Sequence, residues 1–301
     1  MEYELKIEKY PDMTTEAAPK VSELRRIIRV MFTRWVVVIG TIIILGLIAT
    51  AIFAPWLAPY NPIKTNMRKS LKQASGEHLL GTDKLGRDVL SRIIYGTRVS
   101  LWVGVVAVSI ACTIGMSLGL VAGYFTGWIN NIIMRLMDTL MALPPIVLSI
   151  AIAGLLGGGL RNVTISIGIS MVPTYCRLMC GQVLSIKEND YVLAAIANGA
   201  SNLRIMLFHL LPNAFPSILV LITLNMGITI LAEASLSFLG IGISPPAPTW
   251  GAMVSDGYRY LLTNPILSIA PGIAVMLVVL SFNMVGDGLR DALDPKLRGT
   301  L

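Results

Sequence analysis

Few side chains in this chain of 301 residues could do chemistry. There are two histidines, His78 and His209, and three cysteines, Cys112, Cys176 and Cys180. The cysteines lie in apolar segments without partner ligands, which favours buried thiols over a zinc site. No Gly-Lys pair occurs, so a phosphate-binding loop of the GxxxxGK[ST] type is excluded. The sequence therefore predicts no catalytic residue, no metal site and no bound cofactor.

The elements that must position these residues are long and apolar. Only 14% of the residues are charged, against roughly a quarter in a soluble domain. A helix needs about 20 mainly apolar residues to cross a bilayer, and the Ala-, Gly- and Leu-rich texture favours helices over a barrel. We therefore expect an all-α integral membrane protein with six transmembrane helices. The predicted spans lie near residues 35–55, 99–124, 136–156, 162–184, 215–240 and 265–286.

Six spans place both ends of the chain on one side, and the basic run before the first span assigns that side to the cytoplasm. The first apolar segment is too long for a cleaved signal and is expected to stay as an anchor. The net charge of +7 favours anionic lipid over nucleic acid as a partner. Four parts follow: a cytoplasmic segment 1–34 with an amphipathic helix, the first span with an extracytoplasmic loop 35–98, a transmembrane core 99–288, and a cytoplasmic tail 289–301.

Several residues inside the spans predict how the helices pack. Gly115, Gly119 and Gly123 recur every four residues, which favours close packing within the chain over a dimerisation seam. The Pro144–Pro145 pair is expected to kink the third span. Arg177 interrupts the fourth span, where its long side chain can reach towards the headgroups.

Glu233 is an acidic residue within the predicted fifth span. A carboxylate at that depth is expensive and usually faces protein or water. One interpretation places it on a path through the membrane or in a gate. The other makes it a buried link between helices, neutral or hydrogen-bonded. The sequence leaves both open.

The polar loop 185–212 between the fourth and fifth spans contains two short helical patterns that meet at Gly199. Asn198-Gly199 is typical of a helix stop, and Ser201 can cap the helix that follows. Pro212 is expected to end that helix where the fifth span begins. A helix–glycine–helix with apolar and polar faces is typical of a segment that docks into a groove of another protein.

This loop resembles the EAA loop of bacterial ABC importer permeases, whose pattern is EAA-x3-G-x9-I-x-L-P. Matching positions are occupied by Leu193, Ala194, Ala195, Gly199, Leu211 and Pro212, with Leu193 in place of the glutamate and His209 in place of the isoleucine. The resemblance implies a cytoplasmic coupling helix that docks on an ATPase and transmits its nucleotide-driven closure. Without the glutamate, a specific salt bridge to the ATPase is put in doubt.

Longer strings resemble the C-type permease subunit of the dipeptide, oligopeptide and nickel importers. They are residues 78–92, 232–251 and 286–296, so that the resemblance covers nearly everything from the first span onwards. It implies a type I ABC importer permease fold in a bacterial or archaeal cell membrane. The implied partners are a second permease subunit, two ATP-binding subunits that hold ATP and Mg²⁺, and an extracytoplasmic solute-binding protein. Peptides would move inwards by alternating access.

The outer loop carries short turns around Asp83, Arg87 and Asp88, whose side chains can bond their own backbone. These residues are expected either to form a rim that packs on the partner permease or receives the binding protein, or to hold a folded cap. Two rival functions also remain: import of nickel or a metal chelate, and a self-sufficient channel or secondary carrier. The latter would predict more paired charges within the spans.

Overall fold

The structure is a computed structural model, which describes residues 23–243 and 246–293. In this part of the chain nearly all regular structure is helical, and one isolated bridge joins Thr82 to Asp88. The α-helices are α1 (Glu23–Thr33), α2 (Trp35–Leu57), α3 (Val89–Tyr124), α4 (Trp128–Met141), α5 (Pro145–Leu156), α6 (Leu160–Lys187), α7 (Asp190–Ala197), α8 (Asn202–Arg204), α9 (Leu211–Phe238), α10 (Trp250–Tyr258) and α11 (Ile266–Leu293). A 3₁₀ turn covers Met67–Lys69, and a π-helix covers Ile205–Leu210.

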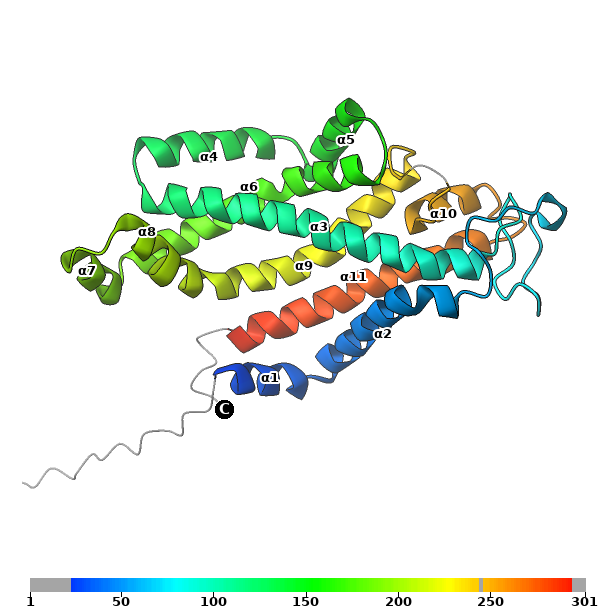
Figure 1. Cartoon of the computed structure of the whole chain (residues 1–301), viewed down its shortest axis with the longest axis horizontal. Helices are drawn as coiled ribbons and strands as arrows, with labels where there is room; N and C mark the ends of the chain where they lie inside the picture. The colour runs from blue at the N-terminus through cyan, green and yellow to red at the C-terminus, as the bar shows by residue number, and fades with distance from the viewer. Residues whose placement is uncertain (1–22, 244–245, 294–301) are drawn as a thin grey trace, which may run out of the picture.

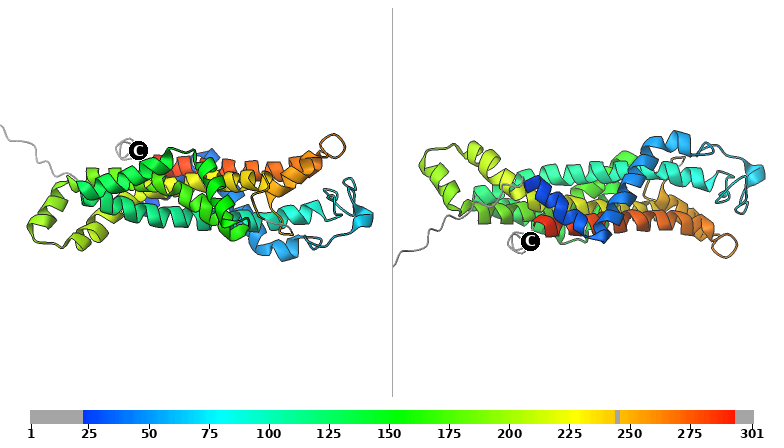
Figure 2. Two further views of the ribbon diagram at one scale, coloured as in Figure 1. Left: turned by 90° about the horizontal axis from the view of Figure 1, so that it is seen from above. Right: turned by 90° about the horizontal axis from the view of Figure 1, so that it is seen from below.

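The long helices run along one axis, with α7 and α8 at one end and the outer loop with α10 at the other (Figure 1). Views from above and below show the same elongated bundle, with α1 and α2 lying across α11 (Figure 2). Five helices are long and apolar enough to cross a membrane, and the bent pair α4–α5 makes a sixth span if it is counted as one. The expectation of a six-span helical membrane protein is thereby confirmed, with a third span that is broken.

The break in the third span lies at the proline pair. α4 ends at Met141 and α5 starts at Pro145, with an angle of 88° between the two helices. Pro144 has an extended backbone, with φ −54° and ψ 137°, because a residue before proline avoids the helical region. The predicted kink is therefore a bend of nearly a right angle, which divides the span into two helices. The first of them, α4, begins at Trp128 rather than at residue 136.

One helix is longer than the predicted span, and one predicted helix end is wrong. The predicted second span, near residues 99–124, belongs to a longer helix that begins at Val89. Pro212 does not end the loop helix: residues Asn202–Phe238 form one apolar helix that passes through the π-helix and then Pro212. Pro212 stands in the first turn of α9, where the preceding π register already changes the hydrogen bonding and the missing N–H is tolerated.

The glycine stripe of α3 packs against α6. A Cβ on Gly115 would lie 2.5 Å from Tyr175 Cβ, and one on Gly119 would lie 2.4 Å from the Cys176 carbonyl oxygen. The predicted use of the stripe, packing within the chain, is confirmed. Because the conflict at Gly119 is with backbone, the two helices would have to separate to admit any side chain.

A Gly119→Val substitution is therefore expected to destabilise the bundle by about 1–3 kcal/mol or more through overpacking. The measurement is the yield and thermal stability of purified protein in detergent. Gly181→Val on α6 is the matched control, because within the described residues no atom lies within 4 Å of a Cβ built there. Equal stability of the two variants would contradict the packing argument.

Both ends of the described chain lie at the same end of the bundle. Arg34, just before α2, forms an ion pair with Asp291 near the end of α11, and α1 packs on α11. This agrees with an even number of spans. The segments 1–22 and 294–301, which include most of the predicted cytoplasmic tail, lie outside the described residues.

Candidate functional site

The loop that carries the EAA resemblance turns at Gly199 through a defined hydrogen-bond motif. The Gly199 N–H donates to the Ile196 carbonyl at 2.9 Å, and the Ala200 N–H donates to the Ala195 carbonyl at 3.1 Å. This is the Schellman pattern, which needs a left-handed residue after the helix. Gly199 supplies it with φ +75°. The motif sets the angle at which α7 leaves α8.

Apolar side chains of this loop are exposed at the end of the bundle. Leu193 is 51% exposed, Leu203 63% and Phe208 71%. A cavity of about 510 Å³ lies among Ser201, Leu203, Arg204, Leu207, Phe208 and His209. We call these exposed residues and this cavity the docking surface. Leu193, in the position of the usual glutamate, adds apolar area to it.

The other predicted coupling residues lie in the same loop with differing exposure. Ala194, Ser201 and Pro212 are exposed, and Ala195, His209 and Leu211 are half-buried. Ser201 occupies the N-cap position of α8, but its side chain forms no capping hydrogen bond within the described structure. The predicted Ser201 cap is wrong in this respect: the Schellman motif, rather than the hydroxyl, positions the second helix.

Contacts that the sequence did not reveal fix the loop to the rest of the bundle. The Tyr124 hydroxyl, at the end of α3, donates to Asn202 Oδ1 at 2.7 Å. Lys187 Nζ donates to the Tyr124 carbonyl at 2.9 Å. Val192, Ile205 and Leu210 are buried beneath the loop. These contacts connect the docking surface to the ends of α3 and α6 and to the start of α9.

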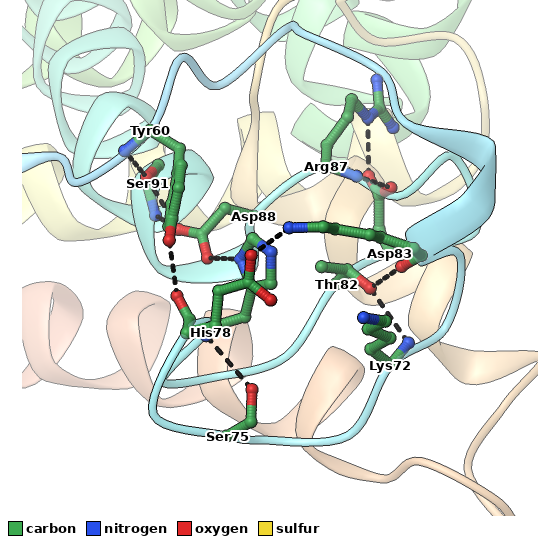
Figure 3. Close-up of polar contacts among 11 residues, drawn as sticks. Tyr60, Lys72, Ser75, His78, Thr82, Asp83, Arg87, Asp88 and Ser91 are labelled. Carbon is green, nitrogen blue, oxygen red and sulfur yellow. Dashed lines mark hydrogen bonds and ion pairs between the residues drawn. The ribbon is translucent and has the colours of Figure 1, made fainter.

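At the opposite end, the outer loop folds into a polar cap over the start of α3 (Figure 3). Asp88 is 3% exposed and is the N-cap residue of α3. Its Oδ2 accepts hydrogen bonds from both the N–H and the hydroxyl of Ser91. Its Oδ1 lies 2.9 Å from His78 Nδ1. Since a carboxylate only accepts, the hydrogen lies on Nδ1.

Asp83 organises the second half of this cap. Its Oδ1 accepts from the backbone N–H groups of Leu85 and Arg87, and its Oδ2 from Arg87 Nε at 2.6 Å. Arg87 is 4% exposed. The three predicted rim residues are thus brought together as internal supports, which is the geometry of the folded-cap alternative. On the exposed side of the cap, the hydrogen bond from Lys69 lowers the pKa of the Glu77 carboxyl.

We expect an Asp88→Ala substitution to open the outer loop. It removes a helix cap worth about 0.5–2 kcal/mol, and leaves buried donors of Ser91 and His78 unpaired. The measurement is proteolysis of the 58–88 segment in sealed vesicles. Glu77→Ala, which removes an exposed acid of the same loop, is the control and is expected to leave the cleavage rate unchanged. Equal protection of the Asp88 variant and the wild type would count against the cap.

Glu233 is fully buried in α9. Its Oε1 accepts from the Ser237 hydroxyl at 2.7 Å, and its Oε2 has no hydrogen-bond partner in the described part of the chain. Helix α10 covers this segment of α9: a Cβ on Gly251 would lie 2.1 Å from the Ala234 carbonyl oxygen. Trp250 Nε1 holds α10 in place by donating to the Ile93 carbonyl of α3 at 3.0 Å.

Two cavities lie along α9 close to Glu233 in the sequence, and Glu233 itself lines neither of them. An outer cavity of about 350 Å³ lies under the cap and is lined by Lys84, Arg87, Ser237 and Asp256, among others. An inner cavity of about 480 Å³ lies between α5, α6 and α9, and its wall includes Ala232 and Ser235. Ala232 and Ser235 of the inner wall are neighbours of Glu233 in the sequence, and its bonding partner Ser237 lines the outer cavity.

A charged pair also lies within the membrane-spanning helices. Arg177 of α6 pairs with Asp138 of α4, and both side chains are about half exposed. Sequence reasoning predicted that Arg177 would reach towards the headgroups; the structure adds that it pairs with Asp138. Charged groups on membrane-spanning helices usually face protein or water rather than lipid. The face formed by α4 and α6 is therefore not a purely lipid-facing surface.

A membrane-spanning bundle with an exposed docking surface at one end, cavities along its length and a capped opposite end is the architecture of a transport permease. The chain belongs to the family described as the binding-protein-dependent transport system inner membrane component, which residues 115–299 match. Residues 22–74 match the N-terminal transmembrane domain of oligopeptide transport permease C. The resemblance drawn from the sequence is thereby confirmed.

Known relatives agree with this assignment. The chain is 45% identical over 261 residues to a dipeptide transport system permease protein, DppC, of Alkalihalophilus pseudofirmus, covering 87% of this chain and 86% of the relative. It is 43% identical to a glutathione transport system permease protein, GsiD, of Escherichia coli, covering 86% of each. Its fold is similar to that of a chain of the MetNI methionine ABC transporter, with a TM-score of 0.55 and 17% sequence identity. The similarity covers 67% of this chain and 97% of the MetNI chain.

Proposed function

We propose that this chain is the permease subunit of an ATP-driven importer of di- or oligopeptides. The observation that carries the proposal is the docking surface, an exposed apolar end on a loop that is rigidly tied to the spans. The dipeptide and glutathione permeases among its relatives support a peptide substrate. In this proposal both ends are cytoplasmic, and the chain pairs with a second permease, two ATP-binding subunits and an extracytoplasmic solute-binding protein.

The geometry suggests how the ATPases would act. The helix Asn202–Phe238 has 37 residues and therefore extends about 55 Å, from the docking surface to the outer cavity. Closure of the ATPases would push on the docking surface at one end of this helix. The π-helix Ile205–Leu210 lies between the docking surface and the rest of this helix. Because π-helical segments are often found at functional sites, we assign to it the bending that would accompany the push.

We place the outer gate at Glu233 and α10. α10 lies tightly on α9 beside Glu233, and its residues Ala252, Ser255 and Asp256 line the outer cavity. Movement of α9 would change the contact with α10 and join the two cavities. A fully buried carboxylate with one unsatisfied oxygen is suited to such a place, because it gains water or a polar partner when the contact opens.

Nickel or a metal chelate is the alternative substrate within the same family. Among the described residues, no group of three or more His, Cys, Asp or Glu side chains could hold a metal ion. The permease itself therefore gives no support to a metal substrate, although the metal ligands could belong to the binding protein. A self-sufficient channel would not need the exposed docking surface.

The proposal is tested by purifying the chain from native membranes and reconstituting the complex with its binding protein. We expect co-purification of ATPase subunits and ATP-dependent uptake of a dipeptide. Leu203→Asp with Phe208→Asp is expected to remove the ATPases, because two charges would be buried in an apolar contact. Leu262→Asp is the control, since Leu262 is fully exposed at the opposite end. Uptake without any ATPase subunit would overturn the proposal.

A further inference from the structure

The outer cavity differs from the inner one in the charges of its wall. Lys84 and Arg87 of the cap and Asp256 of α10 line it, whereas none of the residues found to line the inner cavity is Asp, Glu, Lys or Arg. Its volume of about 350 Å³ lies within the range of about 300–1,000 Å³ found for ligand pockets. Of the two cavities, the outer one is therefore the place where a charged ligand would be recognised.

Arg87 is the buried charge of this wall. Its side chain is 5% exposed, and its Nε donates to Asp83 Oδ2 at 2.6 Å. A guanidinium has five N–H donors, four of them on the terminal nitrogens Nη1 and Nη2. Within the described residues these two nitrogens form no hydrogen bond, and Figure 3 shows them extending beyond the Asp83 carboxylate. Since buried polar groups normally have partners, the fork of Arg87 is available to an acceptor from outside the chain.

The ion pairs around this cavity leave an excess of positive charge. Asp83 Oδ2 lies 2.6 Å from Arg87 Nε and 3.6 Å from Arg92 Nε, so that two buried guanidinium groups share one carboxylate. Lys84 Nζ lies 2.6 Å from Asp256 Oδ1, and both of these side chains are half-exposed. These pairs together hold one cation more than they hold acids. Charges that are partly removed from water act more strongly on a ligand, so the excess favours an anion in the cavity.

We propose that the outer cavity binds the C-terminal carboxylate of a peptide before the peptide enters the bundle. Arg87 supplies two parallel donors, which match the geometry of a carboxylate. Lys84 gives one N–H to Asp256 and has two more for the same ligand. Leu85 and Ile243, which also line the cavity, provide apolar surface for the neighbouring side chain. The site rests on the proposed peptide transport, which it refines by naming the group that is recognised and where.

The first test compares uptake of a dipeptide of two apolar residues, whose only carboxylate is its C-terminus, with uptake of its amidated analogue. The proteoliposomes contain the whole complex and its binding protein, and for each substrate the variant is divided by the wild type, which cancels selection by the binding protein. Arg87→Gln is expected to lower uptake of the free acid at least about tenfold and that of the amide much less.

Lys84→Gln guards against a cap that fails to fold without Arg87. This half-exposed residue supports no other part of the cap through its side chain, and its substitution should lower free-acid uptake less steeply, again with little effect on the amide. Lys72→Gln is the matched control, because Lys72 is an exposed lysine of the same loop that does not line the cavity. If neither Arg87→Gln nor Lys84→Gln distinguished the two substrates, the site would be overturned.

A second measurement needs no uptake. In the purified complex without binding protein, Ala252→Cys places a thiol on the α10 wall of the outer cavity, and Thr174→Cys places one on the wall of the inner cavity as a control. We expect the free-acid dipeptide to slow maleimide labelling at residue 252 only, the amide to have no effect, and Arg87→Gln to abolish the protection. Labelling at residue 252 that neither peptide changes, or that both change equally, would refute the site.

The two proposals fail in different ways. If the wild-type complex imported no peptide, the proposed function would fail, whatever the labelling showed. If it imported the dipeptide and the free acid gave no protection at residue 252, the peptide importer would stand and only the carboxylate site would fail.

Discussion

A Gly199→Pro substitution is expected to leave the chain in the membrane and to weaken binding of the ATPase subunits at least about tenfold. Proline removes the N–H that bonds the Ile196 carbonyl and fixes φ near −65°, whereas Gly199 has φ +75°. The Schellman motif cannot form, so α7 leaves α8 at a different angle and the docking surface loses its shape. Uptake should be lost while any ATPase that remains bound hydrolyses ATP without transport.

The matched control is Gly240→Pro. Gly240 ends α9 through the same motif, with φ +82°, a bond from its N–H to the Ser237 carbonyl and one from the Ile241 N–H to the Leu236 carbonyl. It lies at the opposite end of the bundle. Both variants suffer the same local damage, so that both should still be recovered from the membrane with similar yields. ATPase co-purification should fall only with Gly199→Pro, and unaltered co-purification in that variant would show that the turn does not shape the docking surface.

The second large effect is expected at Glu233. Glu233→Gln keeps the shape of the side chain and an oxygen that can accept the Ser237 hydroxyl, but it cannot become charged. If Glu233 belongs to the gate, the variant folds normally and uptake falls at least about tenfold, equivalent to about 1.4 kcal/mol. If it is a buried link, Glu233→Gln keeps full uptake.

The measurement is initial uptake rate together with thermal stability of the purified complex. Ser237→Ala separates the hydrogen bond from the charge, because it removes the partner of Oε1 and leaves the carboxylate in place. We expect it to lower stability more than Glu233→Gln and uptake less. A Glu233→Gln complex with wild-type uptake would remove Glu233 from the gate and leave it as a link between α9 and its neighbours.

The sequence alone determined that the chain is a helical membrane protein, where its apolar spans lie to within several residues, and that Asn198-Gly199 ends a helix. It also predicted the packing use of the Gly115–Gly123 stripe and the family. These features could be predicted because they are local: hydropathy over about 20 residues, a four-residue period, or a short motif is written in adjacent positions. The helix end predicted at Pro212 was harder, since this proline does not stop a helix that neighbouring helices support.

The tertiary structure alone decided which distant residues meet. Asp138 and Arg177 stand on separate helices and pair only because α4 folds back along α6. His78, Asp88 and Ser91 join because the outer loop closes over α3, although short spacing between polar residues could have indicated it. The 88° turn at Pro144–Pro145 belongs to the same class: proline breaks a helix, but packing sets the angle, and with it the helix end that faces the cavity.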